Sequence, residues 1–188
     1  MIRSPFALIS VSVLALAACG PKDDATTANL QNVASAEIPG AQGAPALSPG
    51  QDFANKAAAS DAFEIAISKL AADKAQSAAI KTFARKMIDA HTQSTAKLKT
   101  AAATATPPII PDPVLTADQQ AKLADLQSKS GAAFDAAFAA EQVSAHEAAL
   151  DVLRGYAANG DVATLKTFAT ETTPIVTAHL NMAKSLKP

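Results

Sequence analysis

The chain carries the same helical pattern twice. Residues 62–71 read AFEIAISKLA and residues 145–154 read AHEAALDVLR, and the motif IKTFA at residues 80–84 returns as LKTFA at residues 165–169. The two copies are offset by about 83 residues before a short turn and by about 85 after it. Each copy predicts a helix–turn–helix, and two such hairpins pack most simply as a four-helix bundle.

The composition agrees with an all-α fold around one core. Aromatic residues make up only 4% of the chain and Trp is absent, whereas Ala, the best helix former, is abundant. A length of 188 residues is enough for one domain with a tail. The charges are nearly balanced, with 16 basic and 17 acidic residues, and this argues against a nucleic-acid partner.

The first hairpin is predicted from residue 48 onwards. Ser48-Pro49-Gly50-Gln51 has the pattern of a capping box and begins a helix at about residues 49–73. A second helix is predicted at about residues 76–103, because apolar residues recur there at helical spacing.

A long crossover separates this hairpin from the second one. Four prolines at residues 107–113 predict a stiff connection, and Thr116 opens a short extra helix that ends near Ser128. The helical pattern resumes at Ala132 and stops at Asn159-Gly160, after which Asp161 is the expected N-cap of the last helix. Residues 48–187 are therefore predicted to form one bundle domain, with the long crossover and the short helix between helices 2 and 3.

The first 47 residues predict a targeting signal followed by a flexible linker. Residues 1–18 form a short signal peptide with Arg3 ahead of an apolar run, and the run ends in Leu-Ala-Ala before Cys19. This resembles a bacterial lipobox, in which Cys19 is lipidated; an ordinary secretory signal or a short anchor is the alternative. Residues 19–47 then predict a flexible linker. The expected localisation is the periplasm-facing cell envelope, and Gly20 after the cysteine favours the outer membrane over the inner one.

The polar residues that interrupt the apolar helix faces are the candidates for a site. Each of the three histidines of the chain, His91, His146 and His179, lies on the inward side of a different helix, and Glu64 interrupts the inner face of the first helix. A count of residues from the crossover end places Glu64, His91 and His146 within roughly one turn of one another, and places His179 about 8–10 Å higher.

Two interpretations of these residues stay open. In one, Glu64, His91 and His146 bind a single transition-metal ion, with His179 as a weaker candidate, because imidazole and carboxylate groups suit Zn, Fe or Cu. In the other, they are buried polar residues that form hydrogen bonds across the bundle. Glu64 would then pair with a histidine, and His179 would pair with Thr172 or a backbone carbonyl.

Several of these segments together resemble the domain-of-unknown-function 4142 family of bacterial envelope proteins. The resemblance covers about residues 48–187 and rests on Glu64, the Asp89-Ala90-His91 step, Phe134-Asp135, His146 and Pro174 with His179. It implies a ferritin-like four-helix bundle and names no reaction. Ferritin-like di-iron sites use Glu-x-x-His motifs, but Ile88, Val143 and Val176 precede the three histidines at that spacing, so a di-iron centre is not expected.

The sequence favours a binding role over catalysis. It contains no nucleophile elbow, P-loop, HExxH, dinucleotide fingerprint or CxxC motif. The leading hypothesis is a membrane-anchored helical lipoprotein that binds an envelope protein partner or serves an envelope or stress function. The alternative is a mononuclear metal-binding protein that uses Glu64, His91 and His146.

Overall fold

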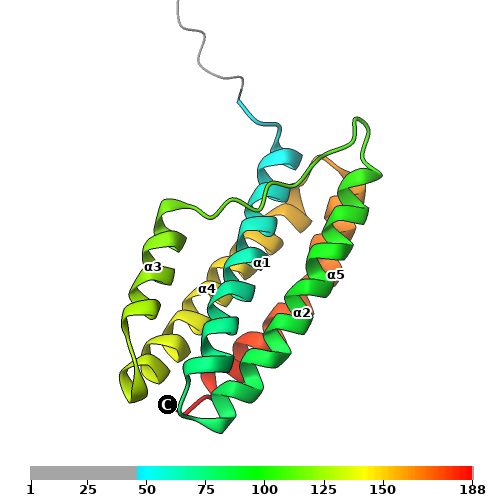
Figure 1. The fold of residues 1–188 in the computed structure, drawn as a ribbon. Helices are drawn as coiled ribbons and strands as arrows, with labels where there is room; N and C mark the ends of the chain where they lie inside the picture. The colour runs from blue at the N-terminus through cyan, green and yellow to red at the C-terminus, as the bar shows by residue number, and fades with distance from the viewer. Residues whose placement is uncertain (1–45, 188) are drawn as a thin grey trace, which may run out of the picture. The chain divides into compact units, whose positions relative to one another are not determined.

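The computed structural model describes residues 46–187, and this part of the chain consists of helices and connecting segments (Figure 1). The five helices are α1 Pro49–Lys74, α2 Ala78–Ala103, α3 Ala117–Ser128, α4 Gly131–Asn159 and α5 Ala163–Lys184. None of them is long and apolar enough to span a membrane. The predicted signal peptide, Cys19 and nearly all of the predicted linker lie outside the described residues.

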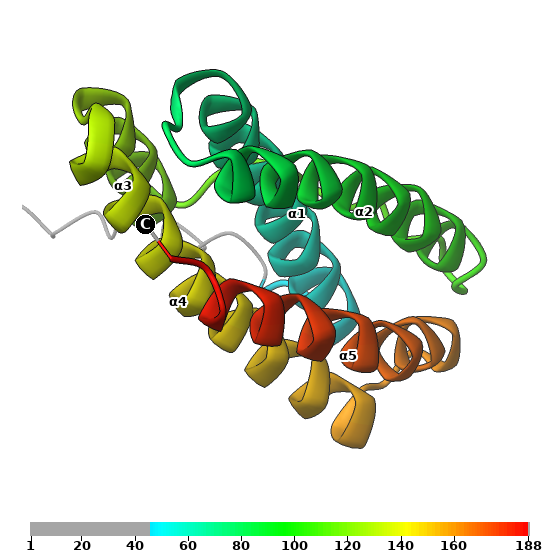
Figure 2. The ribbon, with the colours of Figure 1, turned by 90° about the horizontal axis from the view of Figure 1, so that it is seen from below.

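Four of the helices form the bundle. α1 and α2 make one antiparallel hairpin and α4 and α5 make the other, with α1 packed on α4 and α2 packed on α5 (Figure 2). The all-α class and the bundle of two hairpins are therefore as predicted. The ferritin-like classification stays an expectation from the family resemblance.

The short helix α3 reverses the direction that the sequence predicts for the second hairpin. The crossover leaves the upper end of α2, and α3 runs down beside α1, so α4 begins at the lower end of the bundle (Figure 1). There the Asp135 carboxylate accepts hydrogen bonds from the backbone N–H groups of Gln76 and Ser77, in the turn between α1 and α2, at 3.1 and 2.8 Å. At the upper end, Thr164 at the start of α5 donates to the Ala101 carbonyl of α2 at 2.8 Å.

The helix starts follow the predicted caps with two exceptions. Thr116 and Gln119 form the complete capping box, and Ser48 accepts from the Gln51 N–H at 3.2 Å. The Gln51 side chain does not complete a box at Ser48, because its amide donates to Asn55 and to the Ile110 carbonyl in the crossover instead.

Asp161 is not the N-cap of the last helix, and that prediction was wrong. The N-cap is Val162, which has no side-chain cap. The Asp161 carboxylate accepts from the Tyr156 hydroxyl at 2.9 Å, and that hydroxyl accepts from the Val162 N–H at 3.2 Å. Burial and this hydrogen bond to Asp161 raise the pKa of Tyr156 to about 12. Tyr156 thus organises the turn that Asp161 was expected to organise alone.

The core is divided into two apolar clusters by a layer of polar side chains. The upper cluster contains Phe53, Leu98, Leu150 and Phe168, and the lower cluster contains Ile67, Phe83, Met87, Phe134 and Phe138. Between them lies a set of buried polar residues, here called the polar layer: Asp61, Glu64, His91, Gln142, His146, Thr172 and His179. The candidate site therefore lies in the middle of the bundle, and not in a loop.

Replacement of Asp135 tests the contact that joins the start of α4 to the first hairpin. Asp135→Ala leaves two backbone N–H groups without their acceptor, so we expect the free energy of unfolding to fall by about 1.5–3 kcal/mol. Urea denaturation measures this loss. The control is Asp151→Ala, an exposed position of the same helix, where a change within about 0.5 kcal/mol is expected. Equal effects of the two substitutions would contradict the capping role.

Candidate functional site

Three imidazole rings meet at the centre of the polar layer. His91 of α2, His146 of α4 and His179 of α5 each offer one ring nitrogen such that all three nitrogens lie within 4.8 Å of one another. The ring centroids are 5.6–5.8 Å apart. The exposed fractions of the residues are only 5%, 1% and 9%. We call this set the histidine triangle.

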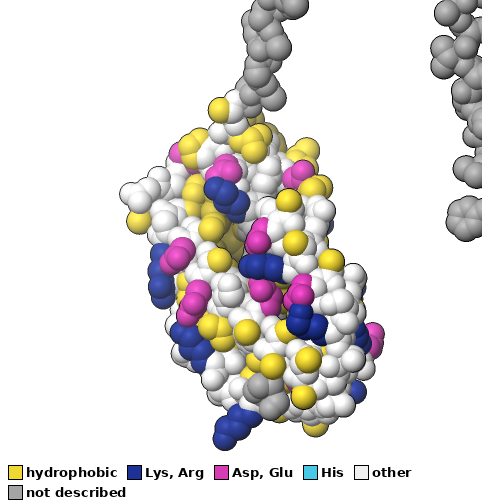
Figure 3. All heavy atoms as spheres, turned by 90° about the vertical axis from the view of Figure 1, so that its left-hand side faces the viewer, with side chains coloured by type: hydrophobic (Ala, Val, Ile, Leu, Met, Phe, Trp, Pro, Cys, Tyr) yellow, Lys and Arg dark blue, Asp and Glu magenta, His cyan; other side chains and the backbone are white. Residues whose placement is uncertain are grey.

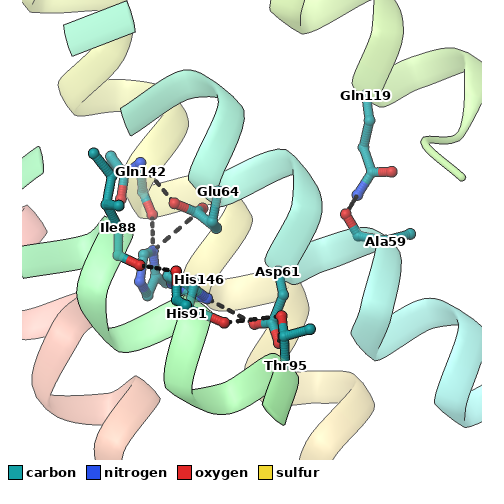
Figure 4. A network of polar contacts seen from close by, with 10 residues as sticks. Ala59, Asp61, Glu64, Ile88, His91, Thr95, Gln119, Gln142 and His146 are labelled. Carbon is teal, nitrogen blue, oxygen red and sulfur yellow. Dashed lines mark hydrogen bonds and ion pairs between the residues drawn. The ribbon is translucent and has the colours of Figure 1, made fainter. Parts of the chain in front are cut away.

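Hydrogen bonds orient two of the rings from behind. The Nδ1 atom of His91 lies 2.8 Å from the Asp61 carboxylate, and that of His146 lies 2.7 Å from the Gln142 carbonyl (Figure 4). Both partners are acceptors, so each Nδ1 donates, and in the neutral ring the lone pair is then on Nε2. Thr95 donates to the second oxygen of Asp61 at 3.2 Å and so helps to orient that carboxylate.

One nitrogen of each ring has no hydrogen-bond partner within the described residues. Nε2 of His91, Nε2 of His146 and Nδ1 of His179 are all buried and make no hydrogen bond within the described residues. Buried polar atoms in native proteins are almost always paired, and each exception calls for a physical reason. Three unpartnered nitrogens on three rings that meet indicate a place for a bound species that accepts lone pairs.

The electrostatics of the triangle favour neutral imidazoles at two corners. Burial lowers the pKa of both His146 and His179 to about 4, and the nearby His91 adds to this effect. For His91 burial acts in the same direction, but the hydrogen bond to Asp61 and the charges of Glu64 and Asp61 outweigh it, so its pKa lies above the usual value. His146 and His179 are therefore neutral near pH 7, and a cation at the triangle competes with a proton only at His91.

Glu64 lies beside the triangle and not in it. One carboxylate oxygen accepts from the Gln142 amide at 2.7 Å, and the other lies 3.7 Å from Nδ1 of His146, on the far side of that ring from the free nitrogen (Figure 4). Burial raises the pKa of Glu64 to about 7 and lowers that of His146 to about 4, so His146 is neutral near pH 7 and this contact is not an ion pair.

The structure brings three of the four candidate residues together. His91, His146 and His179 converge, whereas Glu64 lies beside His146, with a carboxylate oxygen 3.7 Å from its Nδ1. The expected offset of 8–10 Å for His179 was wrong, because it assumed that α4 starts at the crossover end. With α3 running down the bundle, Glu64, His91, His146 and His179 lie 12 to 16 residues from the upper ends of their helices, a spread of about one turn.

Asp61, which holds His91 through its Nδ1, is not among the residues that the sequence pattern singles out. A signal for it exists, because Phe53, Ala57 and Asp61 follow one another at intervals of four residues and so continue one inward-facing row. Two other acidic residues of α4 are not part of the triangle. Glu147 is exposed and pairs with Lys184 at 2.8 Å, and Glu141 pairs with Lys122 at 3.2 Å.

The triangle has the donor set of a mononuclear transition-metal site. Three imidazoles with one open position form the ligand set of one class of zinc centre, and a carboxylate that holds the distal Nδ1–H, as Asp61 does for His91, is a common supporting contact. Tetrahedral bonds of about 2.0–2.1 Å place nitrogens about 3.3 Å apart, so the rings would have to close by up to about 1.5 Å. Side-chain rotation in a layer of unpartnered atoms can provide such a movement.

A cavity leads to the triangle. Its volume is about 410 Å³, and its lining includes His91, His179 and Asp61 among side chains from all five helices. Exposed residues such as Lys56 and Lys97 also line it, so it reaches the surface. Figure 3 shows a hollow with hydrophobic side chains at its floor and charged side chains around it, on the face that carries α3.

One comparison with known proteins gives a match. The family described as a domain of unknown function, DUF4142, matches residues 35–186, which confirms the family that the sequence resembles. No curated protein and no solved structure matches the chain.

The buried carboxyl of Glu64 predicts a specific pH dependence of stability. Because its pKa of about 7 in the folded protein exceeds the ordinary 4.5, Glu64 contributes stability that is complete below about pH 4.5 and is lost as the pH rises through 7. The unfolding free energy of the wild type minus that of Glu64→Gln should therefore fall by up to about 3 kcal/mol between about pH 4.5 and pH 8. Urea denaturation with a chelator present measures the difference.

The exposed repeat counterpart of Glu64 supplies the control for this experiment. Glu147→Gln changes a side chain that is 53% exposed, and its difference from the wild type should vary much less over the same pH range. If the wild-type and Glu64→Gln curves stayed parallel from pH 4.5 to pH 8, the burial of an ionisable Glu64 would be refuted.

Proposed function

We infer that this chain, which belongs to the DUF4142 family, binds one divalent transition-metal ion through His91, His146 and His179. The observation that carries this proposal is the meeting of three buried histidines, each of which offers one ring nitrogen within 4.8 Å of the other two and has one ring nitrogen without a hydrogen-bond partner. Each comes from a different helix, so the fold of the whole bundle, and not a local motif, brings them together.

The donor set selects the class of metal. Imidazole nitrogens suit Zn²⁺, Cu²⁺ and Fe²⁺, whereas Mg²⁺ and Ca²⁺ prefer oxygen ligands. A two-metal carboxylate site has no support, because Glu64 lies behind His146 and the residues three positions before the histidines are apolar. Asp61 and the Gln142 carbonyl act as positioning groups that direct Nε2 of His91 and of His146 inwards.

Metal titration of single-histidine variants tests the site. The purified protein should bind one equivalent of Zn²⁺ or Co²⁺ by isothermal titration calorimetry. His91→Ala, His146→Ala and His179→Ala should each lower the affinity at least about 100-fold, because each removes one of three ligands. The matched control is Lys86→Ala, an exposed position on the same helix as His91, which should leave the affinity unchanged.

Two results of this titration would contradict the proposal. One is the absence of binding to the folded wild-type protein. The other is an affinity that does not change when His179 is replaced, since the sequence-based alternative with Glu64, His91 and His146 as ligands predicts that result. Replacement of Glu64 by Gln separates the two ligand sets further, because only the alternative set loses a ligand.

We also propose that the protein is a lipid-anchored component of the bacterial cell envelope. Support comes from the Leu-Ala-Ala-Cys sequence that ends at Cys19, the one cysteine of the chain, after a short apolar run with Arg3 near its start. Several acyl chains on Cys19 would hold the domain firmly at a membrane, since each buried CH₂ adds about 0.8 kcal/mol. In this setting the domain binds a metal ion and also an envelope protein partner. No reaction is assigned to it.

The Cys19→Ser variant tests the anchor. In a bacterial host with a lipoprotein pathway, the wild-type protein should separate into the detergent-rich phase of a phase-partition experiment and should incorporate labelled fatty acid. The variant should do neither. Wild-type protein that remains in the aqueous phase without label would contradict the lipobox and favour an ordinary secretory signal.

A further inference from the structure

The cavity beside the histidine triangle is larger than packing defects in protein interiors. Well-packed cores contain few voids larger than a water molecule, whereas binding sites for small molecules have volumes of about 300–1,000 Å³. At about 410 Å³ this cavity is within that range. It exists because α1 and α4 present alanines to each other where larger side chains would fill the space: Ala57 on α1, and Ala145 and Ala149 on α4 all line it.

The walls of the cavity would accept the apolar part of a ligand. Val152, Leu153 and Phe168 continue the apolar lining beyond the alanines. Four polar side chains of the polar layer, His91, His179, Asp61 and Thr172, also line the cavity, and other polar and charged side chains, such as Lys97, Gln119 and Glu141, line it elsewhere. Small-molecule sites commonly combine such an apolar lining with a few polar groups that hold the ligand in one orientation.

The charges around the cavity favour an anionic donor group. A divalent ion held by three neutral imidazoles keeps its full positive charge. The acidic side chains of the lining all have partners. Asp61 is hydrogen-bonded to His91, and both Asp118 and Glu141 pair with Lys122. Lys97 adds a cationic group to the lining, whereas Lys56 is paired with Asp52 at 2.7 Å.

The cavity meets the triangle at two of its three corners. His91 and His179 line the cavity, and His146 does not. A ligand in the cavity therefore meets the edge of the triangle between His91 and His179, while α4 and the Glu64–Gln142 pair close the side behind His146. Three protein ligands also leave a fourth position for an exogenous donor.

From these observations we propose that the cavity admits a small organic anion with an apolar body, such as a short-chain carboxylate, and directs its charged head to the open position at the histidine triangle. This rests on the proposed metal binding and extends it, because a purely structural metal site needs neither a cavity nor an open position.

The experiment uses the purified protein loaded with one equivalent of Co²⁺, whose visible absorption bands respond to a change of ligand. Titration with acetate and with hexanoate should shift the bands, and hexanoate should bind at least about tenfold more tightly, because its four additional CH₂ groups become buried in the cavity. Ala149→Phe, which fills the cavity, should abolish this advantage and keep one equivalent of Co²⁺. Ala140→Phe, at an exposed position of the same helix outside the cavity, should preserve the advantage.

The outcomes separate this inference from the proposed function. If Co²⁺ binds but neither carboxylate shifts its bands, or if acetate and hexanoate bind equally, the ligand site is refuted and metal binding stands. If Co²⁺ does not bind the folded protein, both are refuted. The comparison of the two carboxylates on the wild-type protein needs no variant, so it decides the matter even if Ala149→Phe does not fold.

Discussion

Three imidazole rings are buried at the centre of a bundle whose interior is otherwise built mainly from alanine, aliphatic side chains and phenylalanine, and the arrangement of the polar layer depends on them. Burial of a polar atom without a hydrogen-bond partner destabilises the folded protein, and apolar side chains at these positions would avoid this loss of stability. The structure compensates on the outer side of two rings, with Asp61 behind His91 and the Gln142 carbonyl behind His146. This support from one side fixes two of the rings and leaves their Nε2 atoms free to bind a ligand, as a metal site requires.

The duplication of the hairpin explains the bundle but not the site. At the offset of 83 residues, His146 corresponds to Phe63, and the buried Glu64 corresponds to Glu147, which is exposed. The two copies therefore share their packing pattern and differ in their polar residues. The histidine triangle takes one ring from the first hairpin and two from the second, so it is an asymmetric feature of a nearly symmetric framework.

Local patterns in the sequence predict the helices and most of their starts, because caps, prolines and helical periodicity act over a few residues. The same patterns do not predict the direction of α4. That direction depends on whether α3 runs along the bundle, which is a matter of tertiary packing, and the misplacement of His179 followed from it. Asp61 and Gln142 were not identified as supports for the rings for a related reason: an acidic or amide side chain on a helix gains its role only when the facing helix is known.

The central claim is that the three histidines bind one metal ion together, and X-ray absorption at the metal edge tests it most directly. For protein loaded with one equivalent of Zn²⁺, the account predicts three imidazole nitrogens at about 2.0–2.1 Å and one additional light-atom ligand. A spectrum with two or fewer imidazoles and carboxylate oxygens in their place would contradict it.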